Sequence, residues 1–322
     1  MNPRDTVNAQ REEFYGRIEP LNLAPLWTRL KGLVPAAPVP VGVPNRWRYA
    51  EVRPYILESS AHISAAEAER RVLILENPGL RGTSRITSTL FAGLQLIMPG
   101  ELAPKHRHSQ SALRFIVEGS GAYTTIDNDK VVMQPGDFVV TPAWRWHHHG
   151  HEAEGPMVWL DGLDIPMAAH FNSTFRENHD AWREPTSRFD GLIHFPYVRA
   201  RRELERLARS GAPDPHLGHV MRYVDPVDGG WAMPTMATMI RLLAAGFSTL
   251  PYRSSDSMVF VGVEGRGRLE VGDTAFDIEP HDVAVVPGWM TYRLRAIDEM
   301  VVFSYSDRAA QEKLGFFREQ RL

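Results

Sequence analysis

Short apolar runs alternate with turn-forming residues through most of this chain. From Leu90 onward the runs are a few residues long and are separated by clusters of glycine, proline and aspartate. This is the pattern of strands joined by tight turns. Upstream, the charged, alanine-rich stretch 65–71 predicts a short helix that runs into a strand at 72–75, and a further helix is predicted over 198–210. The pattern predicts a mostly β fold with a few helices.

The β-rich part of the chain repeats itself. When Gly246 is set against Gly100, the Glu118-Gly119 turn recurs as Glu264-Gly265. Because each copy needs the same backbone turns, this recurrence indicates a duplicated β-domain. The predicted organisation is an N-terminal helical or extended arm (1–62), a first β-domain (63–165), a helical connection (166–230), a second β-domain (231–308) and a tail (309–322).

Histidines gather in the first copy at spacings that suit a metal site. His106 and His108 are two residues apart, so on a strand they lie on one face. A third imidazole at His147, on a returning strand, completes three ligands around one ion. Imidazole suits iron, zinc, copper or nickel, so the residue type leaves the metal open. The second copy is predicted to hold no catalytic metal, because other side chains stand at the matching positions: Tyr252, Ser254 and Tyr292.

Arg114 shares the face of His106 and His108 if the strand continues. A guanidinium inside a barrel is costly unless it is paired, and no carboxylate on its own strand shares that face. An anionic substrate is the predicted partner, since the guanidinium fork matches a carboxylate. A salt bridge to another strand is the alternative.

Composition narrows the classes of protein. The 322 residues are 43% hydrophobic with a formal net charge of −3, which gives no reason to expect nucleic acid or a membrane surface as a partner. The absence of cysteine excludes disulfides and thiolate metal sites. Residues 1–14 lack the apolar run of a signal peptide, and no apolar stretch is long enough to span a bilayer. A cytoplasmic protein is therefore predicted.

Two stretches of the first copy, 100–108 and 142–147, resemble the two sequence motifs of cupins. Cupins are small jelly-roll β-barrels with a metal inside. The resemblance implies an all-β-dominated fold class with two cupin barrels and N-terminal and connecting helices. Ala112 stands where cupins usually have a glutamate ligand, so three neutral imidazoles would leave the metal with a charge of about +2. That favours a chelating substrate with two negative charges.

A longer resemblance covers nearly the whole chain. The stretches 69–79, 94–121 and 146–150 are similar to the gentisate 1,2-dioxygenase family, which includes salicylate-type and 1-hydroxy-2-naphthoate-type ring-cleaving enzymes. The resemblance implies that the three histidines bind Fe(II), that O₂ is the co-substrate and that the protein is a homo-oligomer, commonly a tetramer.

The same resemblance implies roles for residues around the metal. Arg70 and Arg114 would contact the substrate carboxylate, and His149 would hydrogen-bond its phenolic oxygen or bound oxygen. Ordinary structural roles are the alternative for most of these side chains. The other predicted substrate-binding residues are Gln95, Asp161 and Phe91, of which Asp161 could hold a second ring hydroxyl.

The predicted function is an extradiol-type dioxygenase that opens a small aromatic hydroxy acid. Gentisate is the first candidate, because it is the commonest substrate of the group and Asp161 is present. Salicylate, 5-nitrosalicylate and 1-hydroxy-2-naphthoate are the alternative substrates. A cupin that binds a small aromatic acid without catalysis is the alternative of a different class.

Overall fold

Antiparallel strands are the predominant regular structure of the described residues, so the predicted all-β-dominated class is confirmed. The structure is a computed structural model and describes residues 3–127, 129–178 and 193–322. The chain separates into two compact units, Met1–Val39 and Pro40–Leu322. Among the helices of the described residues, none is long and apolar enough to cross a membrane.

The smaller unit is helical. It contains α1 (Pro3–Ile18), a 3₁₀ turn η1 (Glu19–Leu21) and α2 (Leu26–Leu33). The indole nitrogen of Trp27 donates a hydrogen bond to the Tyr15 hydroxyl at 2.8 Å, which ties α2 to α1. The apolar side chains of α2 are exposed: Leu26, Trp27, Leu30 and Leu33.

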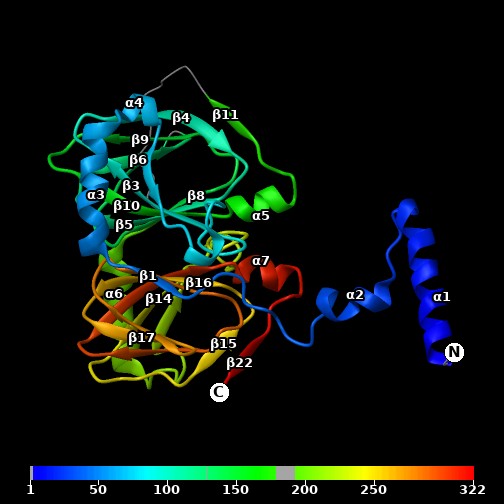
Figure 1. Ribbon diagram of the computed structural model, residues 1–322. Coiled ribbons are helices and arrows are strands. Elements are labelled where there is room, and N and C mark those ends of the chain that lie inside the picture. Colours follow the sequence, from blue (N-terminus) through cyan, green and yellow to red (C-terminus); the bar gives the residue numbers. More distant parts are fainter. Residues whose placement is uncertain (1–2, 128, 179–192) are drawn as a thin grey trace. The chain divides into compact units, whose positions relative to one another are not determined.

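The larger unit contains a first barrel of two sheets (Figure 1). A six-stranded sheet runs in the order β12-β8-β5-β10-β3-β2, and a five-stranded sheet in the order β11-β4-β9-β6-β7. The strands are β2 (Arg71–Ile74), β3 (Phe91–Ile97), β4 (Leu102–His108), β5 (Ala112–Glu118), β6 (Ala122–Ile126), β7 (Asp129–Val132), β8 (Phe138–Thr141), β9 (His147–His151), β10 (Met157–Leu163), β11 (Arg176–Asn178) and β12 (His194–Phe195).

A second barrel has the same design. Its six-stranded sheet is β1-β19-β16-β21-β14-β13 and its five-stranded sheet is β18-β17-β20-β15-β22. The strands are β1 (Asn45–Trp47), β13 (His219–Arg222), β14 (Ala237–Leu243), β15 (Tyr252–Ser254), β16 (Met258–Glu264), β17 (Gly267–Val271), β18 (Thr274–Ile278), β19 (Val283–Val286), β20 (Tyr292–Ala296), β21 (Met300–Ser306) and β22 (Glu319–Arg321).

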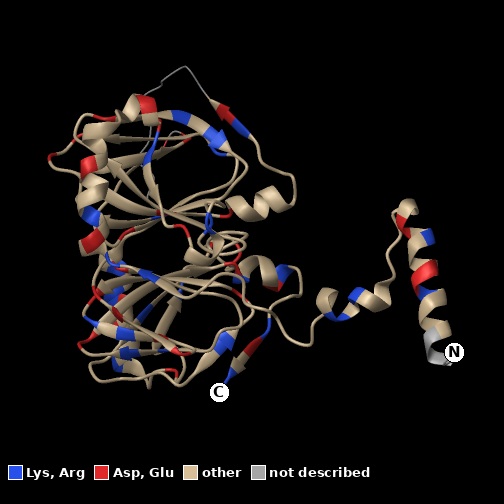
Figure 2. Cartoon of the chain, viewed as in Figure 1, with Lys and Arg blue, Asp and Glu red and all other residues tan. Residues whose placement is uncertain are grey.

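The two barrels share an apolar core. One buried cluster lies inside each barrel, and a third contains side chains from the six-stranded sheets of both. Within this shared cluster the rings of Phe115 and Phe303 stack with centroids 4.3 Å apart. Burial of one such ring stabilises a protein by roughly 1.5–3 kcal/mol, so the barrels hold each other in place. Acidic and basic residues are interspersed over both barrels in the view of Figure 2.

A helix from each repeat bridges the barrels. In the first repeat, α3 (Tyr49–His62) follows β1, which pairs with β19 of the second barrel. The Tyr49 backbone N–H donates to Asp282 of the second barrel, and its hydroxyl donates to Glu118 of the first, both at 2.8 Å.

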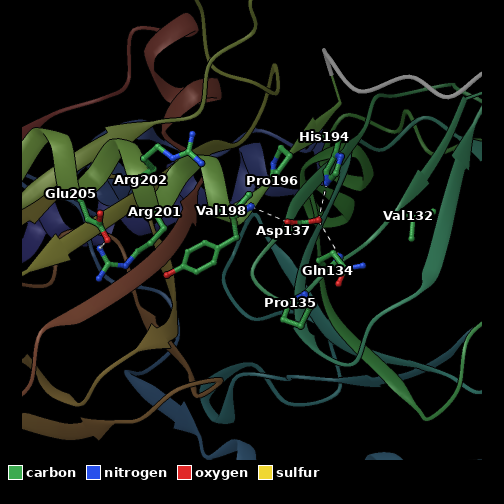
Figure 3. Close-up of a pocket in the computed structure, with 11 residues that line it drawn as sticks. Val132, Gln134, Pro135, Asp137, His194, Pro196, Val198, Arg201, Arg202 and Glu205 are labelled. Carbon is green, nitrogen blue, oxygen red and sulfur yellow. Dashed lines mark hydrogen bonds and ion pairs between the residues drawn. The ribbon is translucent and has the colours of Figure 1, made fainter.

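The second repeat makes the reciprocal contacts. Its helix α6 (Tyr197–Ser210) follows β12, which pairs with β8 of the first barrel. The Tyr197 backbone N–H donates to Asp137 at 2.9 Å, and its hydroxyl donates to Glu264 at 2.5 Å. In Figure 3 dashed lines also join Asp137 to His194 and Gln134. The remaining helices are α4 (Ala65–Ala68), η2 (Pro78–Leu80), α5 (Ile165–His170) and α7 (Arg308–Lys313).

The duplicated unit includes segments that the sequence pattern did not identify as strands. The stretch predicted as a helical connection contains β11, β12 and β13 beside its helices. The predicted tail contains β22, which pairs with β15 as β11 pairs with β4. These strands are two to four residues long, too short to show alternation. We propose that the two repeats span residues 45–178 and 194–321.

Candidate metal centre and substrate cavity

Three histidines meet inside the first barrel. His106 and His108 lie on β4, and His147 on β9 stands opposite His106 in the strand register. One ring nitrogen from each lies within 4.8 Å of the others. The alternation of β4 turns His106 and His108 to the same face, as the spacing predicted. The sequence-predicted ligand set is therefore brought together.

Hydrogen bonds orient two of these rings. Nδ1 of His108 lies 2.9 Å from the Gln110 carbonyl, and Nδ1 of His147 lies 2.9 Å from the Arg145 carbonyl. A carbonyl only accepts, so each Nδ1 carries the proton and Nε2 keeps its lone pair. The Nε2 of His147 is buried and has no hydrogen-bond partner. These two residues therefore present the donor atoms that a divalent transition metal needs.

The histidines stay neutral near pH 7. Burial, and then the charge of Arg70, lowers the pKa of His106 to about 2. Burial lowers the pKa of His108 to about 4, and that of His147 lies well below its ordinary value for the same reason. Metal ligation requires deprotonated imidazole, so no proton has to leave before a metal binds.

Arg70 makes a direct contact with this centre. Its Nη2 lies 2.5 Å from Nδ1 of His106 and 3.2 Å from the Pro104 carbonyl. Arginine only donates, so Nδ1 of His106 accepts in this arrangement. If His106 binds a metal through Nε2, Nδ1 carries a proton and can no longer accept from Arg70. The guanidinium then becomes available to another acceptor in the cavity.

Arg114 is buried and held by several groups. It stands opposite Asp161 on β10, and its Nε lies 3.5 Å from Oδ1 of that carboxylate. Its Nη1 donates to the Thr141 hydroxyl. Burial raises the pKa of Asp161 to about 6, while the charge of Arg114 opposes that rise. The salt bridge to another strand, left open by the sequence, is present in the structure.

His149 lies behind Arg114. Its Nε2 is 2.9 Å from Nη2 of Arg114, so it accepts there, and its Nδ1 is paired with the Thr124 hydroxyl. Both ring nitrogens are thus engaged. His149 is fully buried and is not among the residues that line the cavity. We propose that it positions Arg114 and does not contact the substrate itself.

A cavity of about 330 Å³ opens beside the histidines, near the lower end of the range for small-molecule sites. Eight of the nine sequence-predicted site residues line it, His149 being the exception: Arg70, Phe91, Gln95, His106, His108, Arg114, His147 and Asp161. The structure adds Val72, Gln110, Ala112, Leu163, Ile165, Thr174, Phe175 and Arg176. Apolar side chains thus make one part of the wall and arginines another.

Gln95 offers an unused acceptor to this cavity. Its side chain is almost fully buried on β3, and its Oε1 has no hydrogen-bond partner. A buried carbonyl without a donor costs free energy, which a ligand hydroxyl can recover. Gln95 therefore favours a ligand that carries a hydroxyl at this position.

Arg176 is a cavity residue that sequence reasoning missed. It lies on β11 opposite His108, and its guanidinium pairs with Glu69, the residue before Arg70. Both side chains of this pair are about half exposed at the rim. The signal for β11 was weak, because three residues cannot show alternation.

The second barrel carries different side chains at the metal positions. Tyr252 pairs with Tyr292 across β15 and β20, in the same place in the fold as His106 and His147. The strand pairing therefore agrees with the alignment of the two copies made from the sequence.

A larger cavity of about 590 Å³ lies between the loop that joins β7 to β8 and the first half of α6 (Figure 3). Its histidine and one of its arginines are already paired, since His194 contacts Asp137 at 2.8 Å and Arg201 contacts Glu205 at 3.1 Å. These pairs lie beside α6, and the three histidines line the other cavity.

Comparisons with known proteins agree with this geometry. Residues 93–163 match the family model described as a cupin domain. The chain is 44% identical to a gentisate 1,2-dioxygenase of Aquipseudomonas alcaligenes over 99% of this chain and 98% of the relative. It is 36% identical to a gentisate 1,2-dioxygenase of Streptomyces sp over 98% of both chains.

A solved structure has the same fold. It is a variant of the salicylate 1,2-dioxygenase from Pseudoaminobacter salicylatoxidans in complex with gentisate, with a TM-score of 0.89 at 32% identity. The match covers 100% of this chain and 97% of that chain. With such agreement in sequence and in fold along its whole length, this chain belongs to the gentisate 1,2-dioxygenase family of two-cupin, ring-cleaving dioxygenases.

Proposed function

We propose that this chain is an Fe(II)-dependent dioxygenase that opens the ring of a 2-hydroxybenzoate with O₂, with gentisate as the first candidate substrate. Cleavage falls between the carboxyl-bearing and hydroxyl-bearing ring carbons, and both oxygen atoms are retained. One observation carries the proposal: three neutral imidazoles, two buried and one half-buried, share a cavity with Arg70 and Arg114. The gentisate and salicylate dioxygenases to which the chain is similar support the same class of substrate.

Fe(II) is the metal that the family implies, and the three imidazole nitrogens suit it. When bound, iron would supply the redox chemistry that couples the substrate ring to O₂. The histidines add no negative charge, so the positive charge of the ion would be neutralised by a substrate that carries a carboxylate and a phenolate. Ala112 lines the cavity without offering a further ligand.

The arginines are proposed to hold the substrate carboxylate. Arg70 lines the cavity and, once His106 no longer accepts its hydrogen bond, can turn to an anionic group. Arg114 stays fixed by Asp161, Thr141 and His149 and supplies a buried positive charge. Together they orient the ring before reaction, which is the protein's main contribution.

Gentisate is favoured over salicylate by the cavity's acceptors. Gentisate carries a second ring hydroxyl, and the free Oε1 of Gln95 and the carboxylate of Asp161 both line the cavity. Salicylate lacks that hydroxyl and would leave Gln95 unpaired. The 5-nitro compound and 1-hydroxy-2-naphthoate remain alternatives for the same chemistry.

The test is O₂ uptake after anaerobic loading with Fe(II). The substrates are gentisate, salicylate, 5-nitrosalicylate and 1-hydroxy-2-naphthoate, and the products are identified by mass. Stoichiometric uptake with gentisate, and a product heavier by two oxygen atoms, is expected. Bound iron without uptake on any of the four acids would overturn the proposal in favour of a cupin that only binds an aromatic acid.

We also propose that the chain forms a homo-oligomer, a tetramer by the family resemblance, and works in the cytoplasm. The exposed apolar side chains of α2 support self-association, because such a row on a short helix favours burial against a partner: Leu26, Trp27, Leu30 and Leu33. Light scattering of the full chain tests the oligomer.

A further inference from the structure

A tyrosine of the second barrel reaches the cavity wall of the first. Tyr305 lies on β21 and is almost fully buried in the core shared by the barrels. Its hydroxyl donates a hydrogen bond to the backbone carbonyl of Phe91 at 3.0 Å. Phe91 is the first residue of β3, and its side chain lines the cavity.

The ring of Tyr305 fills a space that Gly162 leaves open. A Cβ at Gly162 would stand 2.9 Å from Cζ and 3.0 Å from Cε2 of Tyr305, and 2.9 Å from Cγ of Leu113, closer than such atoms usually approach. Gly162 lies on β10 between Asp161 and Leu163, and both of these neighbours line the cavity. Leu163 in turn pairs with Phe91. One side chain therefore supports the wall on two adjacent strands.

The two repeats differ at this place. Asp164 follows β10 and accepts from the Ser111 backbone, just as Asp307 follows β21 and accepts from the Ser257 backbone. Counting back from these aspartates, Gly162 and Tyr305 occupy matching positions. The metal-bearing barrel has the glycine and the other barrel has the tyrosine, so the contact acts on one cavity only.

The Tyr305 hydroxyl stays protonated and can always donate its hydrogen bond. Burial, and then the nearby Asp161 carboxylate, raises the pKa of Tyr305. A protonated phenol that donates to a backbone carbonyl fixes the position of that carbonyl, and with it the start of β3.

We propose that Tyr305 is a positioning residue for the substrate: through Phe91 and the Asp161–Leu163 stretch, the second barrel sets the width of the cavity in the first. This inference rests on the proposed function. The second barrel, which has no histidines at the ligand positions, would then take part in substrate selection. It would favour aromatic acids with one ring over those with two.

The test compares Tyr305→Phe with a matched control, Tyr223→Phe, in the full iron-loaded chain. Tyr223 is buried in the same core, but its hydroxyl has no hydrogen-bond partner. Binding of gentisate and of 1-hydroxy-2-naphthoate is measured without O₂, by quenching of ligand fluorescence, and KM and kcat are then measured with O₂. Tyr305→Phe is expected to weaken gentisate binding about fivefold and to move the ratio of the two affinities toward the naphthoate. Iron content and kcat should stay within about twofold, and Tyr223→Phe should match the wild type.

Two further outcomes keep the test decisive. If Tyr305→Phe does not fold, Gly162→Ala places a methyl group against the Tyr305 ring and Leu113 from β10 and should shift the same affinity ratio. An unchanged ratio in the variant that folds, or an equal shift in Tyr223→Phe, overturns the inference. Failure of the proposed function would show differently, as no turnover by the wild type and Tyr223→Phe alike, while the anaerobic affinities would still report on Tyr305.

Discussion

Arg114 and Asp161 stand opposite each other on β5 and β10, with the guanidinium Nε 3.5 Å from the carboxylate. Burial raises the pKa of Asp161 to about 6, against the opposing charge of Arg114. The carboxylate therefore loses its charge as the pH falls through about 6, and Arg114 then remains buried without a counter-charge. The net charge of this pair therefore changes near pH 6, within the range in which activity can be measured.

From this pair we expect kcat/KM for gentisate to fall about tenfold between pH 7 and pH 5, in step with the ionised fraction of Asp161. Asp161→Asn cannot titrate there, so its profile should lack this acid limb and lie below the wild type at pH 7. The measurement is initial O₂ uptake across the pH range. An acid limb that persists unchanged in Asp161→Asn would refute the assignment.

Alanine substitutions should distinguish the roles of two adjacent histidines, His147 and His148. His147→Ala removes one of three donors and is expected to lower bound iron at least tenfold and activity at least a thousandfold, measured by metal analysis and O₂ uptake. His148→Ala is the control, because His148 points to the other face of β9 and packs edge-on against Tyr123. The wild type and this control should bind one iron per chain. Two irons per chain would contradict the assignment of the second barrel.

Gln95 should decide between gentisate and salicylate. In Gln95→Leu the unpaired Oε1 is gone, so gentisate loses an acceptor and salicylate no longer leaves one unsatisfied. We expect the gentisate-to-salicylate ratio of kcat/KM to drop about tenfold. Val72→Ala, a change in the apolar wall, is the comparison and should leave the ratio closer to the wild type. A ratio unaltered by Gln95→Leu would place the second hydroxyl elsewhere.

Arg176 should act as a rim charge. Its pair with Glu69 is half exposed, so its effect is screened and modest. Arg176→Ala is expected to raise KM two- to fivefold at low salt and to have less effect at high salt. Glu69→Gln removes the carboxylate charge that pairs with Arg176 and should lower KM under the same conditions. KM values that move together in both variants would indicate a structural role for the pair.

The metal-free chain should be sensitive to acid. The unfolded chain protonates histidine near pH 6.5, whereas folded His106 stays neutral down to about 2 and His108 to about 4. The unfolded state then binds more protons than the folded state. The free energy of unfolding is therefore highest above pH 6.5 and falls as the pH decreases. The loss is about 1.4 kcal/mol per pH unit for each such histidine. Thermal unfolding of chelator-treated protein should show Tm falling steeply from pH 6.5 to 5, and a flat Tm would argue that these rings are solvated.

The sequence by itself predicted the cluster of three histidines and the duplicated barrels. Alternation on a strand forces His106 and His108 to one face, and turn residues recur because both copies need the same backbone turns, so local rules were sufficient. Arg114 was predicted to lie inside on the assumption that the strand of His106 and His108 continues. That premise was wrong, because β4 ends at His108 and Arg114 lies on β5 of the other sheet, from which its side chain still lines the cavity. These features depend on residues close together in the sequence, so they can be predicted without knowing which distant segments pack against them.

Only the tertiary structure decided what these residues touch. Asp161 neutralises Arg114 from a neighbouring strand, and Arg176 lies on a strand of three residues. His149 uses both ring nitrogens on Arg114 and Thr124 and does not line the cavity. Tyr305 reaches Phe91 across 214 residues of sequence, from a barrel whose ligand positions carry no histidine. Contacts of this kind depend on how sheets pack, and no periodicity along one strand contains that information.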